Sequence, residues 1–300
     1  ASYKDRWRNV NTNTGLPQKP LASEEIYALH NVVLSPGQNF VSFHGVPYTN
    51  TFEGVFGGIE NFPGGLSALP DSGATVIEFY SPGTNAPLSD AYWLNTTGAW
   101  SQVNGGNVTT NLQSSDFFTR GFSITLPNPL PAFYVSTTAY DYNQLDQDGN
   151  PIQVGAMIWS PVAQIPTNST GFSQVIMTGN QTGRVKTNIY NVAALRLPVA
   201  AHPSEMRFLE SGFVNGVLGQ SDEIYTLNTA TKAVLQGSTI YCDGNGVWRF
   251  VTGNGLVPWG YFRPNDVIVI VSRNWVGNGS WTWTYSPFHF YTQPTRWMGY

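Results

Sequence analysis

The chain has 300 residues, enough for one large domain or two ordinary ones with real cores. Charged residues make up only 11% of it and the formal net charge is −4, so it lacks the clustered positive charge of a nucleic-acid-binding surface. Aromatic residues make up 14%, which excludes the composition of a disordered chain. The longest aliphatic run, VIVIV at 267–271, is far shorter than the roughly 18 residues of a membrane-spanning helix.

The cysteine and lysine content indicates the compartment. A single cysteine, Cys242, excludes an intramolecular disulfide and a cysteine-based metal centre, and we expect it to be a small strand residue. Four lysines, abundant Asn and Thr, and a first residue Ala1 are typical of an exported bacterial protein after removal of its signal peptide. We therefore expect a secreted protein, extracellular or at the cell surface.

Residues 1–30 are predicted to form an extended N-terminal arm. The stretch NVNTNTGLPQKP has no apolar periodicity, although SEEIYALH from Ser23 has weak helical spacing. Tyr3 and Trp7 are spaced so that an added strand would present alternate side chains to a partner.

Two regions, 31–131 and 190–300, repeat the same pattern of strands. YWLNTTGAW ends at Trp100 and IYCDGNGVW ends at Trp248, and in both a glycine turn follows an aromatic strand ending. The runs ATVIEFY and DVIVIV are rich in β-branched and aromatic residues, as strands are. We expect both tryptophans to lie in a core, with ligand stacking as the alternative.

Further matches follow in the same order. GVFG returns as GVLG, TVIEFY as DEIYTL, and FFTRGFSITL as YFRPNDVIVI, with offsets of 162, 147 and 144 residues. An insertion in the first copy accounts for the fall in offset. The sequence thus predicts a mainly β protein with two duplicated β-sandwich or β-barrel-like modules. The only other helical signal is SEMRFLES from Ser204.

The connection at 132–189 is predicted to carry a β-hairpin that bridges the modules, because alternating residues flank the turn sequence DQDGNP. The same turn leaves open a weak calcium site formed by Asp141, Asp146 and Asp148. Its spacing does not match a helix–loop–helix calcium site.

The C-terminal segment alternates aromatic residues with Thr and Ser. Trp281, Trp283 and Tyr285 should lie on one face of a strand. Together with Trp297 they form a second candidate contact surface, since Trp and Tyr are enriched in interface cores.

Signatures of enzyme chemistry are not found. The chain has no phosphate-binding loop, nucleophile elbow or HExxH motif, and its four histidines stand singly. A facing pair of carboxylates would suit a glycosidase, but the sequence favours no pair. The candidates are Glu53, Glu78, Asp90, Asp116, Glu223 and Asp243. We expect no catalytic residue, cofactor or metal.

The order SPGQNFVSF, LPDSGATVIEFY, YWLNTTGAW and FFTRGFSITLP, followed by VWRFV and YFRPNDVIVIVSR, resembles exported β-repeat proteins of the planctomycete and verrucomicrobial type. The resemblance covers roughly 35–127 and 190–273. It implies an exported, mainly β protein and assigns no catalytic residue.

Two functions fit these features. The first is an extracellular structural subunit that assembles with copies of itself into a filament or surface layer through its N-terminal arm. The alternative is a secreted carbohydrate-binding β module that uses exposed aromatic rings. Five Asn-x-Ser/Thr sequons leave attached glycans open.

Overall fold

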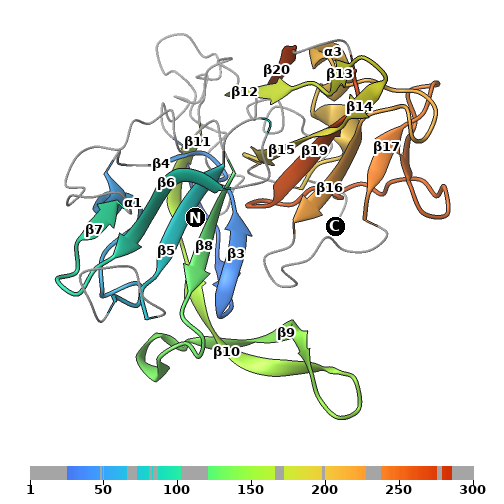
Figure 1. The fold of residues 1–300 in the computed structure, drawn as a ribbon. Coiled ribbons are helices and arrows are strands. Elements are labelled where there is room, and N and C mark those ends of the chain that lie inside the picture. The colour runs from blue at the N-terminus through green and yellow to red at the C-terminus, as the bar shows by residue number, and fades with distance from the viewer. Residues whose placement is uncertain are drawn as a thin grey trace, which may run out of the picture.

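The computed structural model describes residues 26–47, 49, 51–65, 73–80, 83, 87–102, 121–165, 172–197, 200–227, 238–275 and 279–285. The described chain is mainly β and its strands form several antiparallel sheets, as the sequence predicts. Figure 1 shows two groups of strands side by side, the first from the N-terminal part of the chain and the second from the C-terminal part.

The first module is built on a five-stranded sheet with the order β3-β8-β5-β6-β7. Its strands are β3 (Gly37–Val41), β5 (Val76–Tyr80), β6 (Pro87–Leu94), β7 (Trp100–Gln102) and β8 (Phe122–Leu126). A pair of further strands, β2 (Val32–Leu34) and β10 (Pro151–Trp159), contributes side chains to the same core.

Aromatic rings fill this core. Helix α1 (Phe52–Phe56) begins at the capping residue Thr51, whose hydroxyl accepts a hydrogen bond from the backbone N–H of Gly54. The ring of Phe56 stacks on Trp159 of β10, with centroids 5.5 Å apart. Trp100 contacts both phenylalanines of the helix, so the helix and the two sets of strands share one core.

The second module has a five-stranded sheet with the order β15-β19-β16-β17-β18. Its strands are β15 (Ile189–Ala194), β16 (Glu223–Leu227), β17 (Ile240–Cys242), β18 (Trp248–Phe250) and β19 (Val267–Ser272). The paired strands β12 (Phe172–Met177) and β20 (Ser280–Tyr285) and the short helix α3 (Phe208–Ser211) contribute to its core. Phe208 stacks on Trp283 of β20, with centroids 4.5 Å apart.

The two modules have the same strand order. Counted along the chain, β3, β5, β6, β7 and β8 take the same places in their sheet as β15, β16, β17, β18 and β19. In each module one strand of the additional pair precedes the sheet and the other follows it. Trp100 lies opposite Leu94 and Trp248 lies opposite Cys242, and both tryptophans are buried.

The same type of five-residue turn closes three hairpins, at 95–99, 146–150 and 243–247. In each turn the first side chain, Asn95, Asp146 or Asp243, accepts hydrogen bonds from the backbone N–H groups of the third and fifth residues. The fourth residue is a glycine with φ of 80°, 81° and 80° respectively. Positive φ strains any residue with a Cβ, which explains why NTTG, DQDG and DGNG all end in glycine.

Two expectations of the repeat need correction. Ile124 lies opposite Asn39, and Ile270 lies opposite Asn191, so the match between β8 and β19 is displaced by two residues from the one that the sequence suggested. GVFG lies in α1 and its C-terminal cap, whereas GVLG lies in turns at 216–219, so these glycines are not equivalent.

The helical spacing from Ser23 is also misleading. Ile26–Leu29 form strand β1, which pairs with β11 (Val162–Ile165) in a sheet of order β1-β11-β4, where β4 is Val46–Pro47. So short a helix would be marginal, and the partner strand decides the conformation. The signal in SEMRFLES is confirmed as a short 3-10 helix, Pro203–Glu205, followed by α3.

The modules pack against each other through aliphatic side chains. Val267, Val269 and Val271 of β19 lie in one cluster with Tyr80 of the first module. The approach is close at Gly121, where a Cβ would lie 2.8 Å from a methyl group of Val192. Backbone hydrogen bonds join the modules as well, since the N–H of Ser42 donates to the carbonyl of Asn265.

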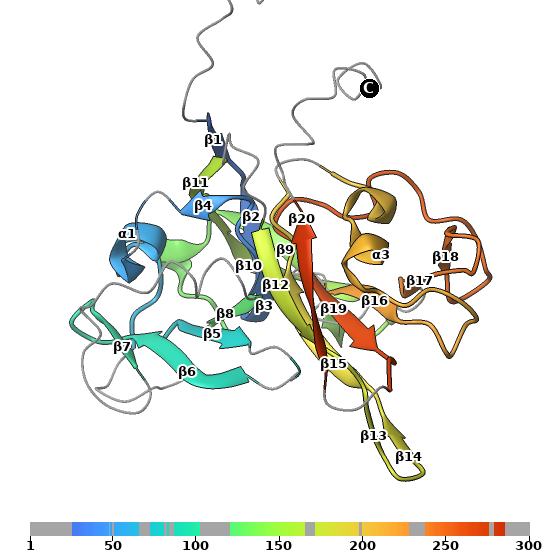
Figure 2. The same cartoon turned by 90° about the horizontal axis from the view of Figure 1, so that it is seen from above.

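Two hairpins extend from this body. β9 (Thr137–Leu145) pairs with β10 in the predicted hairpin, and β13 (Asn180–Thr182) pairs with β14 (Val185–Thr187) in a second one. Figure 1 shows the β9–β10 hairpin reaching below the two sheets, and Figure 2 shows the β13–β14 hairpin reaching away from the second module.

Candidate assembly surfaces

The aromatic residues predicted to make contacts between subunits fall into two groups. Tyr3, Trp7 and Trp297 lie outside the described residues. Trp281, Trp283 and Tyr285 lie on one face of β20, as predicted, and this face points into the second module.

The two innermost of these rings belong to the core. Trp283 and Tyr285 are 0% and 1% exposed. The indole N–H of Trp283 donates to the carbonyl of Met206, and the hydroxyl of Tyr285 accepts from the backbone N–H of Arg196. They are therefore not available as surface contacts, and Trp281 is only partly exposed beside them. The alternating pattern identified a buried face of a strand, which has the same period as an exposed one.

The β9–β10 hairpin presents apolar side chains to solvent. Tyr140 and Leu145 of β9 are 55% and 60% exposed, and Ile158 of β10 is exposed too. Before β9, Phe133 in the 3-10 helix Ala132–Tyr134 is 81% exposed, and Val135 after it is also exposed. An isolated two-stranded hairpin is only marginally stable in water, because it has no core of its own. A hairpin of this length with exposed Tyr and Leu side chains, preceded by an exposed Phe, is suited to burial against another surface.

The charged side chains of the hairpin are all negative. Residues 121–165 contain no lysine or arginine and three aspartates. Asp141 is buried and accepts a hydrogen bond from the side chain of Gln144. Asp146 and Asp148 lie in the exposed turn at the tip, and backbone hydrogen bonds from Asn150 and Asp148 lower the pKa of Asp146. The tip is therefore anionic.

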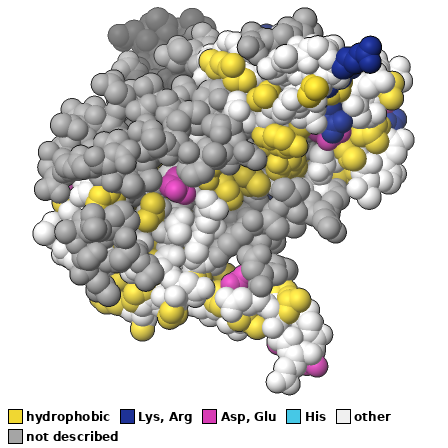
Figure 3. All heavy atoms as spheres, viewed as in Figure 1, with side chains coloured by type: hydrophobic (Ala, Val, Ile, Leu, Met, Phe, Trp, Pro, Cys, Tyr) yellow, Lys and Arg dark blue, Asp and Glu magenta, His cyan; other side chains and the backbone are white. Residues whose placement is uncertain are grey.

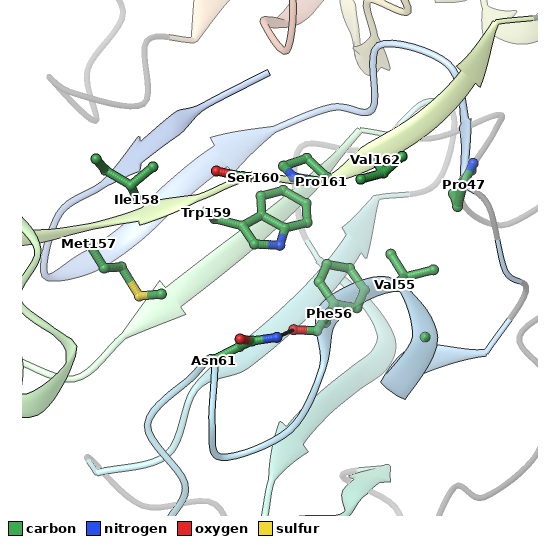
Figure 4. Close-up of a pocket in the computed structure, with 11 residues that line it drawn as sticks. Pro47, Val55, Phe56, Asn61, Met157, Ile158, Trp159, Ser160, Pro161 and Val162 are labelled. Carbon is green, nitrogen blue, oxygen red and sulfur yellow. Dashed lines mark hydrogen bonds between the residues drawn. The ribbon is translucent and has the colours of Figure 1, made fainter. Parts of the chain in front are cut away.

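An apolar pocket of about 670 Å³ lies at the base of the hairpin, between α1 and the end of β10 (Figure 4). Phe56 and Trp159 form its interior, and the exposed residues Ile158 and Val162 lie at its rim. Among the described residues that line it, none is charged, and Asn61 and Ser160 have the only polar side chains. Such a pocket suits an uncharged apolar group.

The carboxylates considered for catalysis lie on separate elements. Glu53 is exposed on α1, Glu78 lies on β5, Glu223 pairs with Arg273 at 2.9 Å, and Asp243 belongs to its turn. Burial raises the pKa of Glu78, and the hydrogen bond from Ser123 partly offsets this. The side chain of Asp90 and the whole of Asp116 lie outside the described parts.

Groups with strongly shifted pKa values have structural explanations. Burial raises the pKa of the Cys242 thiol to about 11, so this strand residue is an unreactive thiol at neutral pH. Burial also lowers the pKa of Arg196 to about 9, and its guanidinium lies 4.5 Å from the ring centre of Phe172. Near the junction of the modules, burial raises the pKa of Asp266 to about 7.

Within the described ranges, no group of three or more His, Cys, Asp or Glu side chains is arranged to hold a metal ion. Asp141, Asp146 and Asp148 are thus not brought together as the calcium ligands that the turn sequence left open. His202 caps the 3-10 helix through a hydrogen bond from Ser204, and His30 and His44 have their rings 4.3 Å apart. In the same parts of the chain, no helix has the length and apolar character needed to cross a membrane.

Comparisons with protein-family models, with curated proteins and with solved structures give no match. The resemblance to exported β-repeat proteins stays a prediction.

Proposed function

We propose that the protein is an extracellular structural subunit that assembles with copies of itself into a filament or surface layer. The observation that carries this proposal is the β9–β10 hairpin, which extends from the body with Tyr140 and Leu145 exposed and is preceded by the exposed Phe133. Burying each of these side chains against a neighbour would contribute about 1.5–3 kcal/mol at most.

A second copy is the favoured partner because the chain carries both a projecting apolar element and an uncharged apolar pocket. Contacts between unlike surfaces on successive copies do not close on themselves unless the rotation between copies completes a ring. They generate filaments or layers. The low charge of the chain and its buried cysteine are compatible with an exported protein.

The same strand order and the equivalent turns support an internal duplication. We infer that the two modules arose as copies of one β sandwich, with the β9–β10 hairpin as the extended end of the first copy. Ile26–Leu29 of the predicted arm pair with β11 of the same chain, so the proposed second contact is restricted to the residues before β1. An extended segment can add to a sheet edge of a neighbouring subunit.

Assembly can be tested by replacing exposed apolar residues of the hairpin with serine. We expect Tyr140→Ser with Leu145→Ser to raise the concentration needed for assembly by roughly tenfold or more, because both side chains would lose an apolar contact. The matched control is Val175→Ser with Leu256→Ser, which removes two exposed apolar side chains elsewhere. Deletion of residues 1–20 should give a folded monomer. Sedimentation and negative-stain microscopy measure the assembly.

Wild-type protein that stays monomeric at high concentration would contradict the proposal. If the hairpin and control variants affect assembly equally, the hairpin is not an assembly contact. In the first case carbohydrate binding is the second candidate, because Trp259 is 73% exposed and its ring lies 4.9 Å from that of His202. Loss of glycan binding in Trp259→Ala would then identify that site.

A further inference from the structure

A polar pocket of about 570 Å³ lies on the second module and shares no lining residue with the apolar one. Three segments meet there: the β13–β14 hairpin, the loop that contains GVLG, and the residues that follow β19. Its lining residues are Gln181, Lys186, Val214, Gln220, Arg273, Asn274 and Trp275.

The pocket is rich in hydrogen-bond donors. The Lys186 ammonium lies 4.4 Å from the ring centre of Trp275. Arg273 donates through Nη1 to the carbonyl of Gly219, 3.0 Å away. Two further donors, Arg273 Nε and Trp275 Nε1, are buried and have no acceptor among the residues that the structure describes. Buried donors of this kind need an acceptor, which a bound group can supply directly or through ordered water.

The acidic side chains next to the pocket are already engaged. Glu223 Oε2 lies 2.9 Å from Arg273 Nη2. The carboxylate of Asp222 accepts from the backbone N–H groups of Arg273 and Val214. Lys186 has no carboxylate partner among the described residues, and Arg184 is exposed on the same hairpin. An anionic group rich in acceptor oxygens, such as a carboxylate, is the complement of this site.

Glycines fix two walls of the pocket. A Cβ on Gly179 would lie 2.8 Å from Cδ1 of Trp275, so only glycine lets the indole pack at this position. Gly219 has a φ of 86°, which brings its carbonyl to Arg273. The GVLG motif, which is not equivalent to GVFG, thus has a local role here.

The same chain carries a carboxylate suited to this pocket. Asp148 is exposed at the tip of the β9–β10 hairpin, and its side chain does not take part in the turn, which Asp146 holds together. Figure 3 shows acidic side chains at the end of this hairpin and basic ones over the second module. Figures 1 and 2 place the two hairpins in different parts of the molecule, so they do not meet within one chain.

We propose that the tip of the β9–β10 hairpin, with Asp148, docks into the polar pocket at Lys186 and Arg273 of the next copy of this chain. This inference rests on the proposed self-assembly and names one of its contacts. Since hairpin and pocket lie on different parts of the molecule, the contact is heterologous and repeats from copy to copy. It also gives the anionic tip a cationic partner that residues 121–165 do not contain.

A charge exchange tests the contact. We expect Asp148→Lys and Lys186→Asp each to raise the concentration needed for assembly about tenfold, because the attraction between these two exposed side chains becomes repulsion. The variant with both substitutions should assemble within about threefold of the wild type, since the pair is then restored with reversed signs. Glu210→Lys, an exposed acid on α3, is the matched control and should not change assembly. Circular dichroism checks that all variants fold.

Wild-type assembly that neither single substitution weakens would overturn the docking while leaving the proposed function intact. So would a double variant that fails to recover, or a Glu210→Lys effect as large as that of Asp148→Lys. A wild-type protein that does not assemble would contradict both proposals. Calorimetric titration with glucuronate and glucose then measures ligand binding at the pocket directly. If glucuronate binds and glucose does not, and if Lys186→Gln abolishes this binding but Arg184→Gln does not, the pocket binds a free carboxylated ligand instead.

Discussion

In the first module the side chain of Asn39 bonds the backbone of Ser35, at the end of β2, and the carbonyl of Ile124 on β8. In the second module Asn191 bonds the backbone of Met177, at the end of β12, and the carbonyl of Ile270 on β19. Each buried amide therefore joins the additional pair of strands to the five-stranded sheet.

The modules differ in the connections between these shared positions. The first extends its last strand into the β9–β10 hairpin, which is acidic and partly apolar. The second inserts the β13–β14 hairpin, with Arg184 and Lys186, between β12 and β15. Interior positions are constrained by packing and by buried hydrogen bonds, whereas surface connections can change without unfolding the module. Surface connections are the natural place for a difference in function.

The largest expected effect comes from the equivalent tryptophans. Trp100→Ala and Trp248→Ala should each lower the free energy of unfolding by about 3–5 kcal/mol, because each leaves a cavity in its core. Urea unfolding measures both. The Phe variants sharpen the comparison: Trp100→Phe should cost about 1 kcal/mol more than Trp248→Phe, since Trp100 Nε1 donates to the carbonyl of Gly57 at 2.8 Å. A loss well below about 3 kcal/mol in either Ala variant would break the equivalence.

The buried asparagines come next. Asn39→Ala and Asn191→Ala should each lower the free energy of unfolding by about 2–4 kcal/mol, because the backbone groups of Ser35 or Met177 lose their partners. Asn31→Ala, at an exposed asparagine, is the control and should cost less than about 1 kcal/mol. A loss at only one of the two buried sites would show that the other amide can be replaced by water.

The smallest effect distinguishes the turns by pH. The hydrogen bond from Arg249 and those from backbone N–H groups lower the pKa of Asp243, whereas Asn95 cannot titrate. A lowered pKa means that the stabilisation is present above the ordinary Asp pKa of about 3.9 and is lost as the pH falls through the lowered value. The amide NMR signals of Val247 should therefore titrate in acid and those of Ala99 should not. Asp243→Asn should abolish the titration; persistence in that variant would refute the assignment.

Much of the architecture follows from the sequence because strands and turns leave local signals. The hairpin at DQDGNP and both glycine turns are confirmed, since a positive φ requires particular residues at particular positions. The match between β8 and β19 was wrong by two residues because a shift of two keeps every side chain on the same face. Local patterns do not distinguish such registers. The register is set by which residue of β8 or β19 lies opposite Asn39 or Asn191.

The candidate surfaces were harder to predict. The alternating aromatics of β20 indicated a surface, but Trp283 and Tyr285 are buried because β12 and β20 cover the core on that side. The polar pocket draws on residues from three segments, separated by up to 94 positions between Gln181 and Trp275. No spacing rule connects them. A usable signal was the clustering of Arg184 and Lys186 in a chain with only 14 basic residues.

Strand β19 links the two modules in a way that bears on how the protein unfolds. Ile268 and Ile270 enter the core of the second module, while Val267, Val269 and Val271 face the first. All six residues of the strand are buried, which is why its sequence reads as an uninterrupted aliphatic run. Separating the modules would expose this valine stripe to water. The two halves should therefore melt in a single cooperative transition, and the second half expressed alone should aggregate through the stripe.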